Sequence, residues 1–138
     1  MPKKLGIKPG ARLCVVRAPD DFTTTLGPLP ADVAIRSVDK ASAAKGQRFD
    51  VIVLFVRELK DLKRDLPALR ERLDPTGGLW IAWPKKASGI ATDAGETNIR
   101  ARGLATGLVD NKICAIDDVW SGLRFVVRLA DRPKARRR

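Results

Sequence analysis

The chain has 138 residues, 44% of them hydrophobic and 31% charged, and its formal net charge is +11. This length predicts one domain, and no apolar run approaches the ~20 residues that cross a bilayer, so no membrane-spanning helix is expected. Histidine is absent and no Cys-x-x-Cys pair occurs, so a zinc site of ordinary composition is excluded, whereas the excess of cations favours anionic partners or simply solubility.

Short apolar runs and turn signals divide the first part of the chain. The Lys-Pro-Gly sequence of residues 8–10 is a turn signal ahead of the first apolar run. A second run ends directly before Asp39, and the glycine and prolines of residues 27–30 must end any helix between the two runs. The predicted elements are a strand over Arg12–Val16, a short helix over Phe22–Leu26, a strand over Val33–Val38 and a short connector over Ala41–Gln47.

The stretch from residue 49 to residue 86 is the centre of the predicted fold. Its apolar runs, Val51–Val56 and Leu79–Trp83, are rich in valine, isoleucine or tryptophan, as is typical of strands covered on both faces. The predicted strands are Asp50–Val56 and Leu79–Trp83. The leucines between them recur at gaps of three and four residues, which places them on one stripe of a helix. Strand, helix and strand form a βαβ unit, so we expect parallel strands and a right-handed crossover. These leucines are Leu59, Leu62, Leu66, Leu69 and Leu73.

Two features are expected to interrupt this unit. Pro67 lacks a backbone N–H, so it should kink the helix or split it near Asp65, which would then cap a second helical piece. Residues 73–78, Leu-Asp-Pro-Thr-Gly-Gly, predict a strong stop and a turn before the second strand.

The last part of the chain predicts one helix and an antiparallel hairpin. Asp93 followed by Glu96 resembles a capping box that starts a helix running to about Leu104, with Gly107 placed to close it. The β-rich runs of the hairpin are Lys112–Ile116 and Leu123–Leu129.

Together these elements predict the α/β class, with a three-layer, Rossmann-like fold, a mostly parallel sheet and an antiparallel C-terminal hairpin. Residues 1–131 form the predicted single domain, and the basic tail of residues 132–138 is predicted to be disordered. The first cations are not followed by the apolar core of a signal peptide, and Cys14 and Cys114 lie in predicted strands. We therefore expect a cytoplasmic protein with free, buried thiols.

The order of the elements resembles a shortened class I methyltransferase, the Rossmann-like fold that binds S-adenosylmethionine. Three segments carry this resemblance: Lys8-Pro9-Gly10 before the first strand, Phe49–Ile52 opening the central strand, and Leu73–Leu79. The last is similar to the Leu-x-Pro-Gly-Gly turn of that superfamily. Such motifs imply a fold, and an activity must be argued from the site.

A more specific resemblance is to an uncharacterised bacterial DUF family. It is carried by Leu5–Gly10 (LGIKPG), Trp83–Lys86 (WPKK) and Trp120–Arg124 (WSGLR). This similarity implies a family and adds no mechanism.

The methyltransferase resemblance implies a cofactor loop after the first strand, and here that loop departs from the family. Relatives have glycines there, which let the backbone approach the cofactor closely, whereas residues 17–22 contain none. Pro19 lacks a donor, and Phe22 could fill the cofactor's place. Asp39 matches the acid that holds the ribose hydroxyls in the family, although an aspartate after a strand is also a common turn former. No nucleophile stands beside an evident base, so no catalytic residue is predicted.

A group of cations predicted at the carboxyl edge of the sheet, which we call the cationic rim, is a stronger candidate for a ligand site than the cofactor loop. Arg17, Arg57, Lys85 and Lys86 all follow predicted strand ends, where ligands sit in open parallel sheets, and Ser88 could add a hydroxyl. Such a cluster without acids would suit a phosphate or a carboxylate. The alternative is that these are solvated surface charges.

Two further features have both a functional and a structural interpretation. Trp83 and Trp120 could form a stacking platform for a base, but tryptophans more often pack in the core or over a sheet edge. The cations of the tail could contact nucleic-acid phosphates or serve solubility. They are Arg132, Lys134, Arg136, Arg137 and Arg138.

The first hypothesis is therefore a degenerate, non-catalytic methyltransferase-like domain that binds an anionic small molecule or protein partner and needs no cofactor. The alternatives are a small S-adenosylmethionine-dependent methyltransferase and a non-specific nucleic-acid accessory protein. No metal and no membrane partner is expected.

Overall fold

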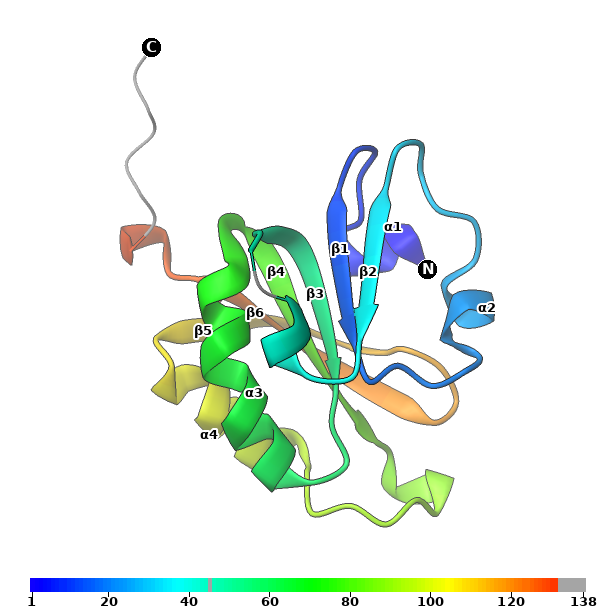
Figure 1. Cartoon of the computed structure of the whole chain (residues 1–138). Helices are drawn as coiled ribbons and strands as arrows, with labels where there is room; N and C mark the ends of the chain where they lie inside the picture. The colour runs from blue at the N-terminus through cyan, green and yellow to red at the C-terminus, as the bar shows by residue number, and fades with distance from the viewer. Residues whose placement is uncertain (45, 132–138) are drawn as a thin grey trace.

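The computed structural model describes residues 1–44 and 46–131, whose course is drawn in Figure 1; the predicted disordered tail lies outside these residues. Of the helices described, none combines the length and apolar character that crossing a bilayer requires. The helices are α1 (Pro2–Leu5), α2 (Phe22–Leu26), α3 (Leu59–Arg72) and α4 (Glu96–Ala105), with 3-10 turns η1 (Ala41–Ala44), η2 (Lys86–Ser88) and η3 (Leu129–Asp131). The strands are β1 (Arg12–Val16), β2 (Ala34–Val38), β3 (Phe49–Phe55), β4 (Leu73–Pro84), β5 (Leu108–Ala115) and β6 (Trp120–Val127).

The described residues form one six-stranded sheet in the order β2-β1-β3-β4-β6-β5. The first four strands in this order are parallel, whereas β6 lies antiparallel to β4, and β5 antiparallel to β6. The predicted α/β class, the mostly parallel sheet and the antiparallel C-terminal hairpin are therefore confirmed.

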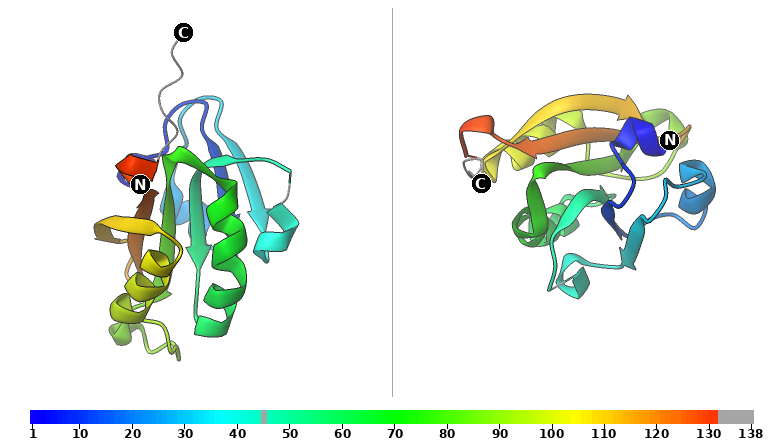
Figure 2. Two further views of the ribbon diagram at one scale, coloured as in Figure 1. Left: turned by 90° about the vertical axis from the view of Figure 1, so that its left-hand side faces the viewer. Right: turned by 90° about the horizontal axis from the view of Figure 1, so that it is seen from above.

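Helices cover both faces of the sheet (Figure 2). The buried apolar side chains form two clusters, one on each face. The leucine stripe of α3 and Ile99 of α4 pack onto one face. Leu5 of α1 and the Phe22 and Leu26 side chains of α2 pack onto the other. The side chains of β3 alternate between the two cores, which is why almost every residue of that strand is apolar.

The N-terminal helix α1 is not predicted by the sequence, because four residues are too few to show a helical period. It begins with Pro2 and ends at Gly6, whose left-handed φ of 82° suits glycine. Its place on the sheet is held by the buried Leu5 and by a hydrogen bond of 3.0 Å from the indole N–H of Trp80 to the Leu5 carbonyl. Tertiary packing therefore forms this helix.

The predicted split of the central helix at Pro67 is wrong. α3 is one helix that continues through Pro67, and Asp65 is buried within it and caps no second piece. A proline inside a helix costs about 3 kcal/mol. Burial of Leu66 and Leu69 on either side of it contributes about 2 kcal/mol each, which is enough to offset that cost.

The predicted turn over residues 73–78 is also wrong, although α3 ends where expected. Leu73 already pairs with Phe49, so β4 begins directly after the helix, and the register shifts a few residues later. Gly77 lies against the Asp50 carbonyl of β3, where a Cβ atom would have no room. The glycines thus allow an irregular strand to approach its neighbour rather than form a free turn.

The two cysteines differ in their surroundings. Cys14 is free and fully buried, and desolvation raises the pKa of its thiol to about 11. Cys114 is free and partly exposed, and burial raises its pKa as well. The prediction of buried thiols is therefore right for Cys14 and only partly right for Cys114.

Candidate functional site

The strand order creates a crevice at the carboxyl edge of the sheet, to which the arrowheads of β1, β2 and β3 point in Figure 1. From β1 the chain passes to β2 on one side and then to β3 on the other, so the loops after β1 and β3 turn away from each other. A cavity of about 1090 Å³ lies here, and we call it the switch-point groove. It is lined by residues 17–19 after β1, by Phe55, Arg57, Glu58 and Asp61 at the end of β3 and the start of α3, by residues 90–93 after β4, and by Trp120 of β6.

Hydrogen bonds join the two walls of the switch-point groove. The hydroxyl of Thr92, in the loop after β4, donates to the Arg57 carbonyl at 2.6 Å. The carboxylate of Asp93 accepts from the backbone N–H of Leu59, the first amide of α3, at 2.8 Å. The position of Arg57 at the mouth of the groove is therefore fixed by its backbone, while its side chain stays exposed.

Arg17 forms intramolecular contacts through its guanidinium, so it is not a free cation of the predicted rim. Its guanidinium donates at 2.7 Å to the Asp39 carbonyl and forms an ion pair of 2.8 Å with Asp65. The expectation of cations converging without acids is therefore wrong at this position. The arginine instead links the end of β1 to the end of β2 and to α3.

Asp65, predicted only as a helix cap, is a buried acid that lies behind the groove and binds Arg17. Only 1% of it is exposed, and its carboxylate accepts hydrogen bonds from Arg17, from Arg64 and from the backbone N–H of Ala41. Burial by itself would raise the pKa of this carboxyl, but the hydrogen bonds and the nearby charge of Arg17 hold its pKa below the ordinary value. Its burial could have been predicted from the sequence, because Asp65 lies on the leucine stripe of the helix, between Leu62 and Leu69.

The other predicted rim residues lie mainly outside the groove. Lys85 donates to the Asp117 carbonyl at 2.8 Å, and the Ser88 hydroxyl donates to the Lys85 carbonyl at 2.6 Å, so both stabilise the loop after β4. Lys86 is exposed. Arg57 and Lys86 have no ion-pair partner among residues 1–44 and 46–131. Of the five predicted residues, only Arg17 and Arg57 line the switch-point groove.

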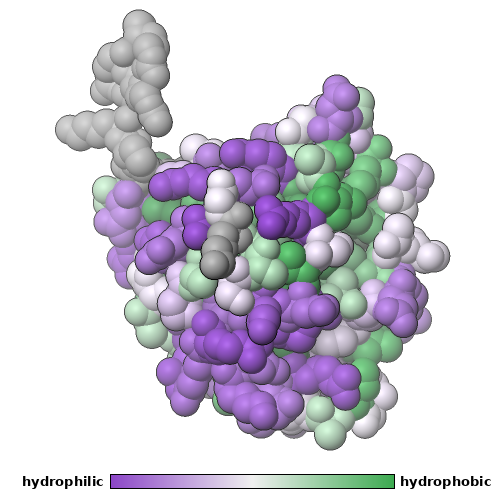
Figure 3. Space-filling model, viewed as in Figure 1, coloured by the Kyte–Doolittle hydropathy of each residue, from purple (hydrophilic) through white to green (hydrophobic). Residues whose placement is uncertain are grey.

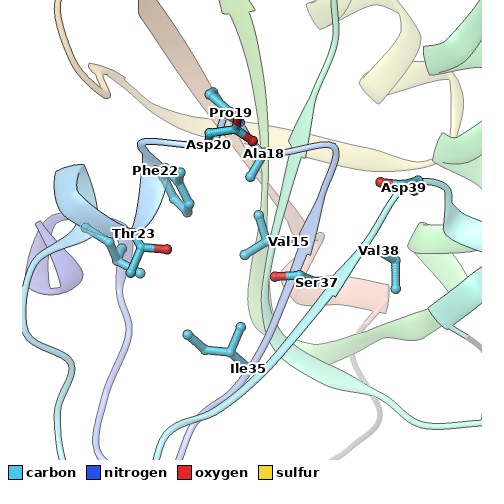
Figure 4. Close-up of a pocket in the computed structure, with 11 residues that line it drawn as sticks. Val15, Ala18, Pro19, Asp20, Phe22, Thr23, Ile35, Ser37, Val38 and Asp39 are labelled. Carbon is cyan, nitrogen blue, oxygen red and sulfur yellow. The ribbon is translucent and has the colours of Figure 1, made fainter.

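Asp39 lines a second, smaller cavity of about 260 Å³ between β1, β2 and α2, which we call the α2 cleft (Figure 4). Ala18 and Pro19 line both cavities, so the loop after β1 separates them. Asp39 is exposed at the end of β2, so its carboxylate is accessible to a ligand. Within the described part of the chain, no group of three or more Cys, Asp or Glu side chains gathers as for a metal ion.

An aromatic row lies below the loop after β1. The rings of Phe22 and Phe55, and those of Phe55 and Trp120, meet edge to face with centroids 5.0 Å apart in each pair. Phe22 is therefore packed in the core and lines the α2 cleft, leaving the switch-point groove open. Trp83 and Trp120 are each only 7% exposed, which supports core packing over a stacking platform.

Comparison with known proteins reveals similarity at the level of the fold. No protein-family model and no curated protein matches the sequence. Solved structures do match. A precorrin-6y C5,15-methyltransferase from Geobacter metallireducens GS-15 has a TM-score of 0.65 and 10% identity, over 91% of this chain and 84% of that chain.

Two further matches have the same character. A SAM-dependent methyltransferase from Aquifex aeolicus has a TM-score of 0.60 and 13% identity, over 89% of this chain and 85% of that chain. A magnesium protoporphyrin IX methyltransferase from Synechocystis PCC 6803, solved with bound SAH, has a TM-score of 0.61 and 11% identity, over 86% and 75%. Identities this low show the fold alone. The chain therefore has the α/β fold of class I SAM-dependent methyltransferases.

Proposed function

We propose that this chain is a small S-adenosylmethionine-dependent methyltransferase whose cofactor binds in the switch-point groove. The observation that supports this most is the position of the groove, at the switch point of a sheet with methyltransferase-like topology, where open α/β sheets bind ligands. A volume of about 1090 Å³ is ample for a ligand of this size. The similarity of fold supports this alternative better than the non-catalytic hypothesis.

The missing glycines do not rule out the turn that such a loop needs. Arg17 at the end of β1 has a left-handed φ of 56°, the conformation that glycine adopts most easily. Its guanidinium is anchored on Asp65 and on the Asp39 carbonyl. These bonds stabilise a turn that would otherwise be strained, because non-glycine residues disfavour positive φ.

The groove is lined by positive and negative side chains. This matches the cofactor, which carries one carboxylate and two positive centres. The exposed guanidinium of Arg57 would bind the carboxylate, and the carboxylates of Glu58 and Asp61 would face the positive centres. Asp39, beyond the shared Ala18–Pro19 loop, is the candidate for the ribose hydroxyls. The DUF-family resemblance adds no activity to this proposal.

The bound cofactor would supply a methyl group activated by its positively charged sulfur. The residues of this chain would bind and orient the acceptor and exclude water. Glu58 and Asp61 are the groove carboxylates that can accept the proton lost by the acceptor, a role that needs neither histidine nor tyrosine.

Isothermal titration calorimetry with S-adenosylmethionine and S-adenosylhomocysteine tests the proposal. We expect a dissociation constant on the order of micromolar for the wild type, and at least about tenfold weaker binding by Arg57→Ala and by Asp39→Ala, because a charged contact is worth about 1.5–3 kcal/mol. Asp118→Ala is the matched control, since this exposed aspartate lines neither cavity. No binding of either compound at millimolar concentration would contradict the proposal.

Non-catalytic binding of an anionic ligand is the second candidate, favoured by the unpaired state of Arg57 and Lys86 described above. Thermal unfolding in inorganic phosphate separates it from the first. A melting temperature that phosphate raises in the wild type but not in Arg57→Ala/Lys86→Ala, together with no heat from S-adenosylmethionine, would favour this second candidate. Nucleic-acid binding by the tail cations stays a prediction, because they lie outside the described residues.

A further inference from the structure

Within residues 1–44 and 46–131, the backbone of β2 has no partner strand along one side. β2 is the end strand of the sheet that these residues form, and β1 pairs with it on the other side. The Ala34 N–H donates to the Ala11 carbonyl at 3.0 Å, and the Val38 carbonyl accepts from the Arg17 N–H at 2.9 Å. Successive residues of a strand point their backbone groups to opposite sides, so those of Ile35 and Ser37 point away from β1.

This free edge is exposed and borders an apolar cleft. All of Ala34–Ser37 is exposed, and Ile35 is 46% exposed despite its apolar side chain. Figure 4 shows Ile35 of β2 and Phe22 of α2 projecting into the α2 cleft, with Val15 behind them and Ser37 at its side. Figure 3 shows apolar surface over this part of the molecule, whereas the surface over α3 is hydrophilic. A volume of about 260 Å³ accommodates one or two apolar side chains.

The segment that forms the cleft and the edge is acidic within a basic chain. Residues 18–39 carry four aspartates and one arginine, a net charge of −3, whereas the chain as a whole carries +11. The four carboxylates, Asp20, Asp21, Asp32 and Asp39, are exposed, and none forms an ion pair within the described residues. The single cation, Arg36, turns away and donates to the Ala43 carbonyl at 2.9 Å.

We propose that the free edge of β2 and the α2 cleft bind an extended, basic peptide segment of another protein, which adds to the sheet as a further strand. The backbone groups of Ile35 and Ser37 would pair with the peptide, and the cleft would take one of its apolar side chains. Asp20, Asp21 and Asp32 would attract its lysines or arginines, and Asp39 stays assigned to the cofactor. A second copy of this chain is disfavoured as the occupant, because pairing β2 with β2 would bring two segments of charge −3 together.

The test uses the full chain and a fluorescein-labelled peptide of alternating lysine and valine, followed by fluorescence anisotropy. The key pair of variants is Ser37→Pro and Ser37→Ala. Proline removes the outward N–H without breaking a ladder bond to β1, whereas alanine keeps that N–H. We expect Ser37→Pro and Ile35→Asn each to weaken binding at least about tenfold, the size of one lost hydrogen bond or apolar contact, and Ser37→Ala to leave it unchanged. Asparagine removes the apolar side chain of Ile35 without adding a charge that would attract the basic peptide.

Three comparisons make the result decisive. A peptide of alternating glutamate and valine, and one of alternating lysine and serine, should bind at least about tenfold more weakly, since one loses the charge match and the other the apolar side chain. The amides of Ile35 and Ser37 in the wild type should gain protection from hydrogen exchange when the basic peptide is added, which decides the matter if Ser37→Pro fails to fold. Equal binding of all peptides, protection elsewhere only, or a dimer by light scattering that the peptide does not dissociate would overturn the proposal.

Discussion

The Asp65→Ala variant is expected to lose about 3 kcal/mol of unfolding free energy, the scale for breaking a buried ion pair from one side. The substitution removes the acceptor of the Arg17 side chain, which is only 25% exposed, and leaves the Ala41 N–H without its partner. It also releases the turn at the end of β1 that Arg17 holds. Urea denaturation followed by circular dichroism measures the loss.

Glu71→Ala is the matched control, because this exposed acid lies on the same helix and forms no ion pair among the described residues. Its effect should stay within about 0.5 kcal/mol. Equal effects of Asp65→Ala and Glu71→Ala would show that the ion pair between Arg17 and Asp65 does not stabilise the fold.

Acid should remove the contribution of Asp65. Because its hydrogen bonds hold the pKa of Asp65 below the ordinary value, the stabilisation is complete above about pH 4, the pKa of an unfolded aspartate. It is lost as pH falls through the lower pKa of the folded state. The gap in unfolding free energy between the wild type and Asp65→Asn should therefore narrow in acid, and a gap of constant size would contradict this assignment.

Gly103→Ala is expected to destabilise the protein by about 2 kcal/mol although alanine is the better helix former. A Cβ atom at this position in α4 would collide with the ring of Phe125, which is fully buried on β6. The ring cannot move away, because it is packed in the core below α4 and α3. The clash should exceed the gain of about 1 kcal/mol in helix propensity.

Gly95→Ala supplies the comparison, because a Cβ atom there meets nothing within 4 Å and its φ of −153° is ordinary extended backbone. Its effect should be small. The double variant Gly103→Ala/Phe125→Leu should recover part of the loss relative to the sum of the two single variants. Strict additivity, measured by urea denaturation, would mean that the two side chains do not meet.

The fold follows from the sequence where patterns are long and local. The leucine stripe of α3 and the apolar runs on either side predict the βαβ unit, and that unit is present. The failures lie where tertiary contacts outweigh local signals. Pro67 is tolerated because buried leucines flank it, and α1 forms because Trp80 and the core hold Leu5 in place.

The site is less predictable, because pairing across the sheet is not encoded in spacing. The sequence places Arg17 at the carboxyl edge correctly, but nothing near it reveals that Asp65 lies opposite, 48 positions along the chain. The same holds for Lys85, whose partner is a carbonyl in a distant loop. Arg57 keeps its predicted position in the groove because its location depends only on the end of β3.

The bonds that Thr92 and Asp93 make across the switch-point groove have an entropic and a kinetic consequence. They order the loop after β4 against the start of α3 during folding, so this wall need not be ordered again when a ligand arrives. Immobilising a side chain on binding costs about 0.5–1.5 kcal/mol, a cost that a preformed wall avoids. Because this wall is already in place, we expect it to add no loop-closure step to binding, a step that would appear as a saturating phase on the microsecond-to-millisecond scale.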